Sequence, residues 1–141
     1  MAPEPDAPML LCLDLEQGSD RLVARAAPIA QRWAAPVRIV HATRTALTGP
    51  QTKDVMARLH ALVDGPLAGH AVDGVELAQG VAEHVIVAAA NRCGAIAIVL
   101  GRRSRSTVER IYVGSTTSAV ISLAQRPVLV LPLDGDENAS A

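Results

Sequence analysis

Aromatic side chains are almost absent from this sequence of 141 residues, which contains no phenylalanine, one tryptophan and one tyrosine. Proteins that bind single-stranded nucleic acid usually stack the bases on exposed aromatic rings, and this sequence offers no such surface. The formal net charge of −1 gives no general attraction to DNA, RNA or anionic lipid. We therefore expect neither a nucleic acid nor a membrane as a partner.

Long apolar runs and a secretion signal are missing as well. No run approaches the ~20 apolar residues that span a bilayer, and the first eight residues, MAPEPDAP, are acidic and proline-rich. These features predict a cytoplasmic protein. Because that compartment is reducing, we expect Cys12 and Cys93 to be free thiols. Neither has partners at metal-ligand spacing.

The sequence is instead rich in small and branched apolar residues, in alternating strand and helix patterns. Continuous apolar runs, typical of strands buried on both faces, occupy residues 9–13, 95–100 and 128–131, and a further buried strand is expected at 37–42, after Pro36. An alternating pattern predicts a short edge strand at 74–78. Apolar residues recur at helical spacing across 18–33, 55–63, 82–93 and 114–124. This order predicts an α/β domain over residues 9–133, with a flexible leader at 1–8 and a polar tail at 134–141.

Three local expectations accompany this pattern. An interior proline, Pro28, predicts a kink in the first helix. We expect Trp33, on the same helix, to fill the core. Residues 43–50 are polar, contain Gly-Pro and are expected to form a loop.

Candidate ligand-binding residues follow the strands. In open parallel sheets, ligands bind beyond the carboxyl ends of the strands, where the strand order reverses. One carboxylate, Asp14, follows the first strand, and Gly114, Ser115 and Thr116 begin the last helix. Glycine lets the backbone approach a phosphate, a helix N-terminus favours an anion, and a carboxylate can accept from ribose hydroxyls. These residue types together indicate a nucleotide site.

Two residue types near this edge have alternative interpretations. The arginines after the fourth strand could bind a polyphosphate or could merely solvate a loop; they are Arg102, Arg103, Arg105 and Arg110. His41 ends an apolar strand, which is more typical of a structural histidine than of a catalytic base.

Familiar catalytic motifs are absent. The sequence contains no G-x-G-x-x-G, no G-x-x-x-x-G-K-[ST], no G-x-S-x-G and no H-E-x-x-H. It also offers no nucleophile–base pair and no lysine at a phosphate loop. We do not expect a dedicated enzyme, although slow ATP hydrolysis is compatible with an open phosphate site. A small α/β hydrolase or transferase is the disfavoured alternative, because it would need a nucleophile elbow.

The segment from Gly101 to Pro132, GRRSRSTVERIYVGSTTSAVISLAQRPVLVLP, resembles the C-terminal signature of the universal stress protein family. Nucleotide-binding members carry Gly, two residues, Gly, nine residues, then Gly-Ser or Gly-Thr. Gly101, Gly114 and Ser115 fall on that spacing, whereas Ser104 replaces the second glycine. Upstream, LLCLDLEQ, VRIVHATR and VELAQG resemble the first three strands of the family and the glycine turn after the third.

The resemblance implies a Rossmann-like fold, an open five-stranded parallel sheet of order 3-2-1-4-5 with helices on both faces. It implies an adenine nucleotide as ligand, ATP with or without magnesium. Asp14 would hold the ribose, and Ala42 and Leu100 would contact the adenine. The implied phosphate cradle consists of Gly101, Ser104, Gly114, Ser115 and Thr116.

The implied function is that of a nucleotide-binding regulatory module in the stress response. The alternative is a nucleotide-free, dimeric protein-interaction module of the same family. These two alternatives differ in whether a phosphate can bind beside Ser104 and Glu16. A carboxylate such as that of Glu16 repels nearby phosphates. A homodimer through strand 128–132 is expected in both cases, since that edge strand carries no charge.

Overall fold

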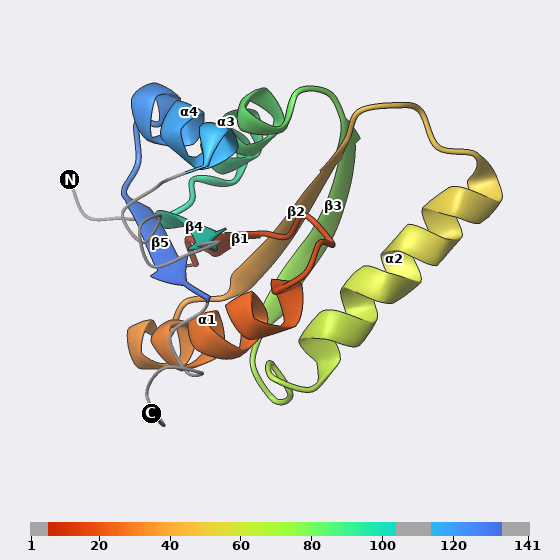
Figure 1. Cartoon of the computed structure of the whole chain (residues 1–141). Coiled ribbons are helices and arrows are strands. Elements are labelled where there is room, and N and C mark those ends of the chain that lie inside the picture. Colours follow the sequence, from red (N-terminus) through yellow and green to blue (C-terminus); the bar gives the residue numbers. More distant parts are fainter. Residues whose placement is uncertain (1–5, 104–113, 134–141) are drawn as a thin grey trace, which may run out of the picture.

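The computed structural model describes residues 6–103 and 114–133, which form a parallel sheet between two layers of helices (Figure 1). The strands are β1 (Met9–Cys12), β2 (Val37–Thr43), β3 (Val72–Gln79), β4 (Ala97–Arg102) and β5 (Val128–Pro132). The helices are α1 (Ser19–Trp33), α2 (Gly49–Asp64), α3 (Ala82–Cys93) and α4 (Ser115–Leu123). The strands pair in parallel in the order β3-β2-β1-β4-β5, which confirms the predicted fold class.

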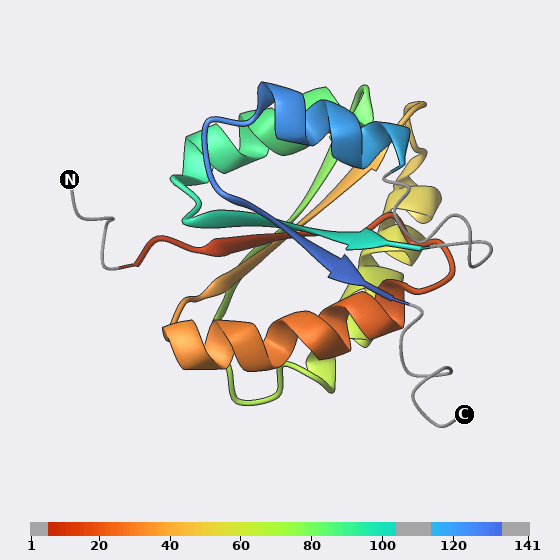
Figure 2. The ribbon, with the colours of Figure 1, turned by 60° about the vertical axis from the view of Figure 1, so that its left-hand side comes forward.

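The two faces of the sheet are covered by different helices (Figure 2). Side chains alternate along a strand, so Met9 and Leu11 of β1 pack with α1 and α2. Leu10 and Cys12 pack on the opposite face with α3 and α4. Because both of its faces are buried, the central strand β1 is apolar at every position.

Alanines at the helix–sheet contacts explain how a core without phenylalanine is filled. Ala26 and Ala30 of α1 and Ala89 and Ala90 of α3 are all buried, and each lies in one of the two apolar clusters. A small side chain lets a helix backbone lie close to the sheet, where branched aliphatic side chains fill the remaining space.

The second helix begins earlier than the sequence pattern predicts. Residues 43–50 were expected to be a loop, but α2 starts at Gly49. The Thr48 side chain accepts from the Gln51 N–H, and the Gln51 side chain accepts from the Thr48 N–H, which forms a capping box. Figure 1 shows the N-terminal half of α2 extending beyond the sheet. Its buried residues, Leu59 and Val63, both lie in the second half.

Of the two expectations for α1, the kink at Pro28 stays a prediction, and the one for Trp33 needs revision. The helix is continuous through Pro28, which lies on its exposed face. The carbonyl group that loses its partner there can bond to water. Trp33 was expected in the core, but 49% of its surface is exposed. It occupies the last residue of α1, where the helix leaves the sheet, so the prediction for Trp33 was wrong.

Arginines of α1 connect the first helix to the last strand. The Arg21 guanidinium donates from Nη1 to the carbonyl oxygen of Leu133 at 2.9 Å. One turn further along the helix, Arg25 donates to the carbonyl oxygen of Pro132. These two contacts join segments more than 100 residues apart in the chain and fix the end of β5 over α1. No helix in the described ranges is both long and apolar enough to cross a membrane.

Candidate functional site

A pocket of about 160 Å³ opens at the carboxyl edge of the sheet, where β1 and β4 lie side by side. The connection from β1 leads through α1 to β2, whereas the connection from β4 leads through α4 to β5. The strand order therefore reverses at this point, which is where ligands bind in open parallel sheets. The walls come from the ends of β1, β2 and β4 and from the first turns of α1, α3 and α4.

Most of the residues that the sequence singled out lie together in this pocket. Asp14, Ala42, Leu100, Gly101 and Thr116 all line it. They come from four separate segments of the chain, because parallel strands bring their carboxyl ends to one edge.

The remaining candidates lie beside the pocket or outside the described residues. Gly114 is the N-cap of α4 and Ser115 its first residue; both are exposed, and neither lines the pocket. Ser104 falls in the segment 104–113, outside the described residues. Gly114 has no side chain, so it provides no side-chain acceptor for the first N–H groups of α4.

Asp14 is held in place by the loop that follows it. One carboxylate oxygen, Oδ1, accepts from the Glu16 N–H at 2.8 Å and from the Ser19 hydroxyl at 3.1 Å. The other oxygen, Oδ2, lies 3.3 Å from Nη2 of Arg103. Of the pocket-lining residues within the described part of the chain, two are charged, Asp14 and Arg103.

Backbone conformation shapes the loop between β1 and α1. Gly18 has φ 99, and Leu15 has φ 60. A left-handed backbone costs a non-glycine residue roughly 1–2 kcal/mol, so the loop is strained at Leu15. A Cβ on Gly18 would also lie 3.1 Å from Cδ1 of Leu133. This conformation leads the chain from Asp14 back to the start of α1.

Sequence analysis missed several residues of the pocket. Gly18 and Ser19 were interpreted only as helix-start residues, yet both line the pocket; Gln17, Thr117 and Leu133 line it as well. The glycine before Ser19 was the available signal, because a glycine between a strand and a helix often marks a special backbone conformation.

The inner part of the pocket is apolar. Cys12, Leu22, Val40, Ile86 and Leu100 contribute to its lining. Burial raises the pKa of the Cys12 thiol well above its usual range, so this thiol stays protonated and unreactive. The inner surface is therefore suited to a flat apolar group rather than to nucleophilic chemistry.

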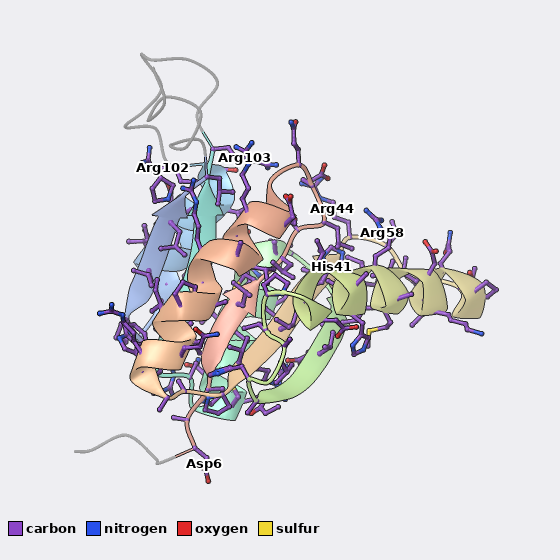
Figure 3. All side chains as sticks on the ribbon, turned by 90° about the horizontal axis from the view of Figure 1, so that it is seen from below. Asp6, His41, Arg44, Arg58, Arg102 and Arg103 are labelled. Atoms are coloured by element: carbon purple, nitrogen blue, oxygen red, sulfur yellow. The ribbon has the colours of Figure 1, made fainter. Side chains whose placement is uncertain are left out.

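A second pocket, of about 450 Å³, lies on the other side of the same loop, against α2. Glu16 and Arg58 line this second pocket and not the first one. Arg58 donates weakly to the carbonyl oxygen of Leu15 at 3.4 Å. Figure 3 shows Arg103 at the end of β4 near α1, while Arg58, Arg44 and His41 lie toward α2. The Glu16 carboxylate is thus separated by the loop from the pocket of Asp14.

His41 and the possible metal ligands fit a structural interpretation. Nδ1 of His41 lies 2.6 Å from the carbonyl oxygen of Leu13, so this nitrogen carries the proton and donates it. Within residues 6–103 and 114–133, no group of three or more His, Cys, Asp and Glu side chains could hold a metal ion.

The fold and the pocket together define a small doubly wound α/β domain with one crevice at the switch point of its sheet. The chain belongs to the universal stress protein family, since the family's model matches residues 7–132. A search of curated proteins found no match.

Solved structures agree in fold. The chain is similar to a universal stress protein from Archaeoglobus fulgidus, with 23% identity, a TM-score of 0.70, and coverage of 88% of this chain and 97% of that one. A structure of the protein from the same organism in complex with dAMP shares 22% identity and has a TM-score of 0.67, with coverage of 88% and 96%. A universal stress protein in complex with cAMP shares 24% identity and has a TM-score of 0.66, with coverage of 92% and 100%.

Proposed function

We propose that this protein is a regulatory module that binds an adenine nucleotide, ATP, in the pocket between β1 and β4. The observation that carries the proposal is the convergence of Asp14, Ala42, Leu100, Gly101 and Thr116 on that pocket. Similar proteins bound to dAMP and cAMP support the class of ligand.

The chemistry of the pocket suits the three parts of a nucleotide. The apolar wall formed by Val40, Ala42 and Leu100 suits the faces of a purine. The Asp14 carboxylate suits the hydroxyls of the ribose, because it is acceptor-only when ionised. The N-terminus of α4 lies at the mouth and favours the phosphates through its N–H groups and its dipole.

Magnesium would enter with the phosphates. Among the described residues that line the pocket, the one carboxylate is that of Asp14. Mg²⁺ keeps several waters and is usually held by one or two carboxylates together with substrate phosphates, so the lining fits a nucleotide-carried ion. When bound, the ion would neutralise phosphate charge, and Asp14 would contribute one oxygen or a water-mediated contact.

The direct test is to identify and measure the ligand. Purified protein is denatured, and the released small molecules are identified by mass spectrometry. Protein freed of ligand is then titrated with ATP by calorimetry, where we expect saturable binding. No heat of binding at millimolar ATP would refute the proposal.

The second candidate, a nucleotide-free dimeric interaction module, has one observation in its favour. The edge strand β5 leaves four apolar residues partly exposed, from Val128 to Leu131. We propose a homodimer through residues 128–132 for either function, in a cytoplasmic protein whose described cysteines are free thiols. Dimerisation without any nucleotide binding would select this second candidate.

A further inference from the structure

The side chain of Arg103 crosses the mouth of the pocket. Arg103 follows β4 directly, and its guanidinium reaches the loop after β1. Nη2 lies 3.3 Å from Oδ2 of Asp14, and Nη1 donates to the carbonyl oxygen of Gln17. The stem of the side chain passes over Gly18, where a Cβ would lie 3.5 Å from Cδ of Arg103. Arg103 thus joins the two walls of the crevice.

This contact occupies the carboxylate oxygen that a ligand would need. Oδ1 of Asp14 already accepts from Glu16 N–H and the Ser19 hydroxyl, so Oδ2 is the oxygen on which Arg103 and an incoming hydroxyl would compete. With Arg103 in this position the pocket measures about 160 Å³. Sites for drug-sized ligands measure roughly 300–1,000 Å³. A ligand hydroxyl that binds Oδ2 of Asp14 therefore displaces Arg103 from this carboxylate.

The Arg103–Asp14 ion pair can separate at a low cost in free energy. Its side chains are 42% exposed for Arg103 and 60% for Asp14. Exposed ion pairs contribute little to stability, because water screens them and side-chain entropy opposes them. A released guanidinium at this position still faces the pocket that Gly101 and Thr116 line. Guanidinium binds phosphate in a planar, two-pronged geometry and more strongly than it binds a neutral acceptor.

We propose that Arg103 makes the pocket selective for phosphorylated ligands by exchanging partners, from Asp14 to a ligand phosphate. When a nucleoside binds, its ribose displaces Arg103 from Asp14, and the ligand provides no anion that Arg103 could bind instead. When a nucleotide binds, its ribose likewise displaces Arg103 from Asp14, but its phosphate gives Arg103 a new partner. The inference rests on the proposed nucleotide function and adds to it the residue that distinguishes a nucleotide from its nucleoside.

Arg58 provides a matched control. It carries the same charge, contacts the other side of the same loop at the carbonyl of Leu15, and lines only the second pocket. Arg58→Gln and Arg103→Gln therefore change the net charge equally, but only the second removes a guanidinium from the pocket.

The experiment compares ATP with adenosine. Calorimetry gives the dissociation constants of both ligands for wild type, Arg103→Gln and Arg58→Gln, and circular dichroism checks that each variant is folded. We expect Arg103→Gln to bind adenosine several-fold more tightly than wild type and ATP about tenfold more weakly. The preference for ATP over adenosine should fall by at least tenfold, whereas Arg58→Gln should leave it unchanged.

Each other outcome overturns the inference in a distinguishable way. If wild type binds ATP and Arg103→Gln keeps the full preference for ATP, Arg103 does not sense phosphate, and the nucleotide function stands. If Arg103→Gln binds both ligands more tightly by the same factor, Arg103 is only a barrier. If neither wild type nor the variant binds either ligand, the proposed function fails, and the inference fails with it.

Discussion

Gly101 and Gly114 occupy two positions of the same sequence signature, but the structure explains only one of them by packing. A Cβ on Gly101 would lie 2.7 Å from Cδ1 of Leu133, so a side chain there would displace the Leu133 side chain, which follows β5. Gly114 has φ −58, a conformation open to any residue, and a Cβ there would meet nothing within 4 Å among the described atoms. Among the described residues, packing does not require glycine at 114, and the role that we propose for it is the close approach of a phosphate.

Replacing Gly114 should separate binding from folding. Because the proposed phosphate position lies against its backbone, Gly114→Val should weaken ATP binding tens-fold, about 1.4 kcal/mol for each factor of ten. The melting temperature should hardly change. Gly49→Val is the control, since Gly49 also begins a helix in open space but lies far from the pocket lining. Calorimetry measures both variants, and an unchanged ATP affinity in Gly114→Val would remove α4 from the site.

The Cys12 thiol should make stability depend on pH in the alkaline range. Its pKa is raised by burial, so the folded protein keeps the proton that the unfolded chain loses above about pH 8.5. Stability should be insensitive to this group below that pH and fall above it, by about 2 kcal/mol near pH 10. Urea midpoints at pH 7 and pH 10 for wild type and Cys12→Ala test this. An equal alkaline loss in both proteins would contradict it.

At the scale of single residues, the sequence indicated which residues lie at the pocket better than it indicated which side chains contact one another. Asp14 was found because the end of the first apolar run is visible in the sequence, and Ala42 and Leu100 were found through the resemblance to the family. The Arg103–Asp14 pair could not be predicted, since it joins residues 89 positions apart whose side-chain directions depend on the loop. The left-handed conformation of Leu15 likewise has no signal in a sequence, because leucine is not a residue that favours it.

At the scale of elements, α2 begins with a capping box, but the first half of this helix contains no buried residue. Thr48→Ala removes the acceptor for the Gln51 N–H, a change that typically costs about 1 kcal/mol. Because the buried residues Leu59 and Val63 lie in the second half of the helix, we expect this cost to appear locally. Hydrogen exchange should become faster across residues 49–56 and stay unchanged in the central strands. Thr52→Ala, one turn further on, should have the smaller effect, and equal effects would argue against the capping role.

The strands were easier to predict than the helix ends. Strands buried on both faces are continuous apolar runs, and the expected strand at 128–131 differs from β5 by a single residue. The start of α2 was missed because Gly49 and Pro50 suggested a loop, although proline is favoured in the first turn of a helix. Trp33 was placed in the core from its helical spacing, which does not reveal where a helix leaves its sheet.

At the scale of the whole molecule, β5 offers a short edge with a defined register. The Ile98 N–H donates to the Pro127 carbonyl at 2.8 Å, and the Leu133 N–H donates to the Arg102 carbonyl at 2.9 Å. Backbone groups alternate along a strand, so those of Val128, Val130 and Pro132 point away from β4. Proline has no N–H, and the Pro132 carbonyl accepts from Arg25. The backbone groups of Val128 and Val130 therefore remain available at the edge. A two-fold, antiparallel pairing that uses both residues places Val128 opposite Val130 of the second copy.

This register makes the dimer testable. Val130→Pro removes an N–H that faces the open edge and leaves the ladder to β4 intact, so the variant should fold and be monomeric. Val130→Ala keeps the N–H and should remain dimeric. Light scattering at micromolar concentration gives both masses, and a monomeric wild type would sink the proposal.

The same register places Leu129 on the two-fold axis. Its Cα would lie about 4.5 Å from that of its counterpart, as in a non-hydrogen-bonded antiparallel pair, which is within the range for a disulfide. Leu129→Cys, in a Cys93→Ala background, should therefore cross-link to itself on oxidation. Cross-linking through Leu131→Cys instead would indicate a register shifted along the strand.

The arginines of α1 that bind the end of β5 also set an order of events during synthesis. Arg21 and Arg25 emerge from the ribosome more than 100 residues before the carbonyl groups of Leu133 and Pro132 that accept their hydrogen bonds. Until then β4 is itself an edge, and α1 covers β1 and β4 but not yet β5. Contacts of such sequence separation are slow to form because a long loop must close first. The sheet of the nascent chain therefore lacks its last strand until the end of synthesis. During this interval a chaperone or a second copy of the chain can reach the exposed edge of β4.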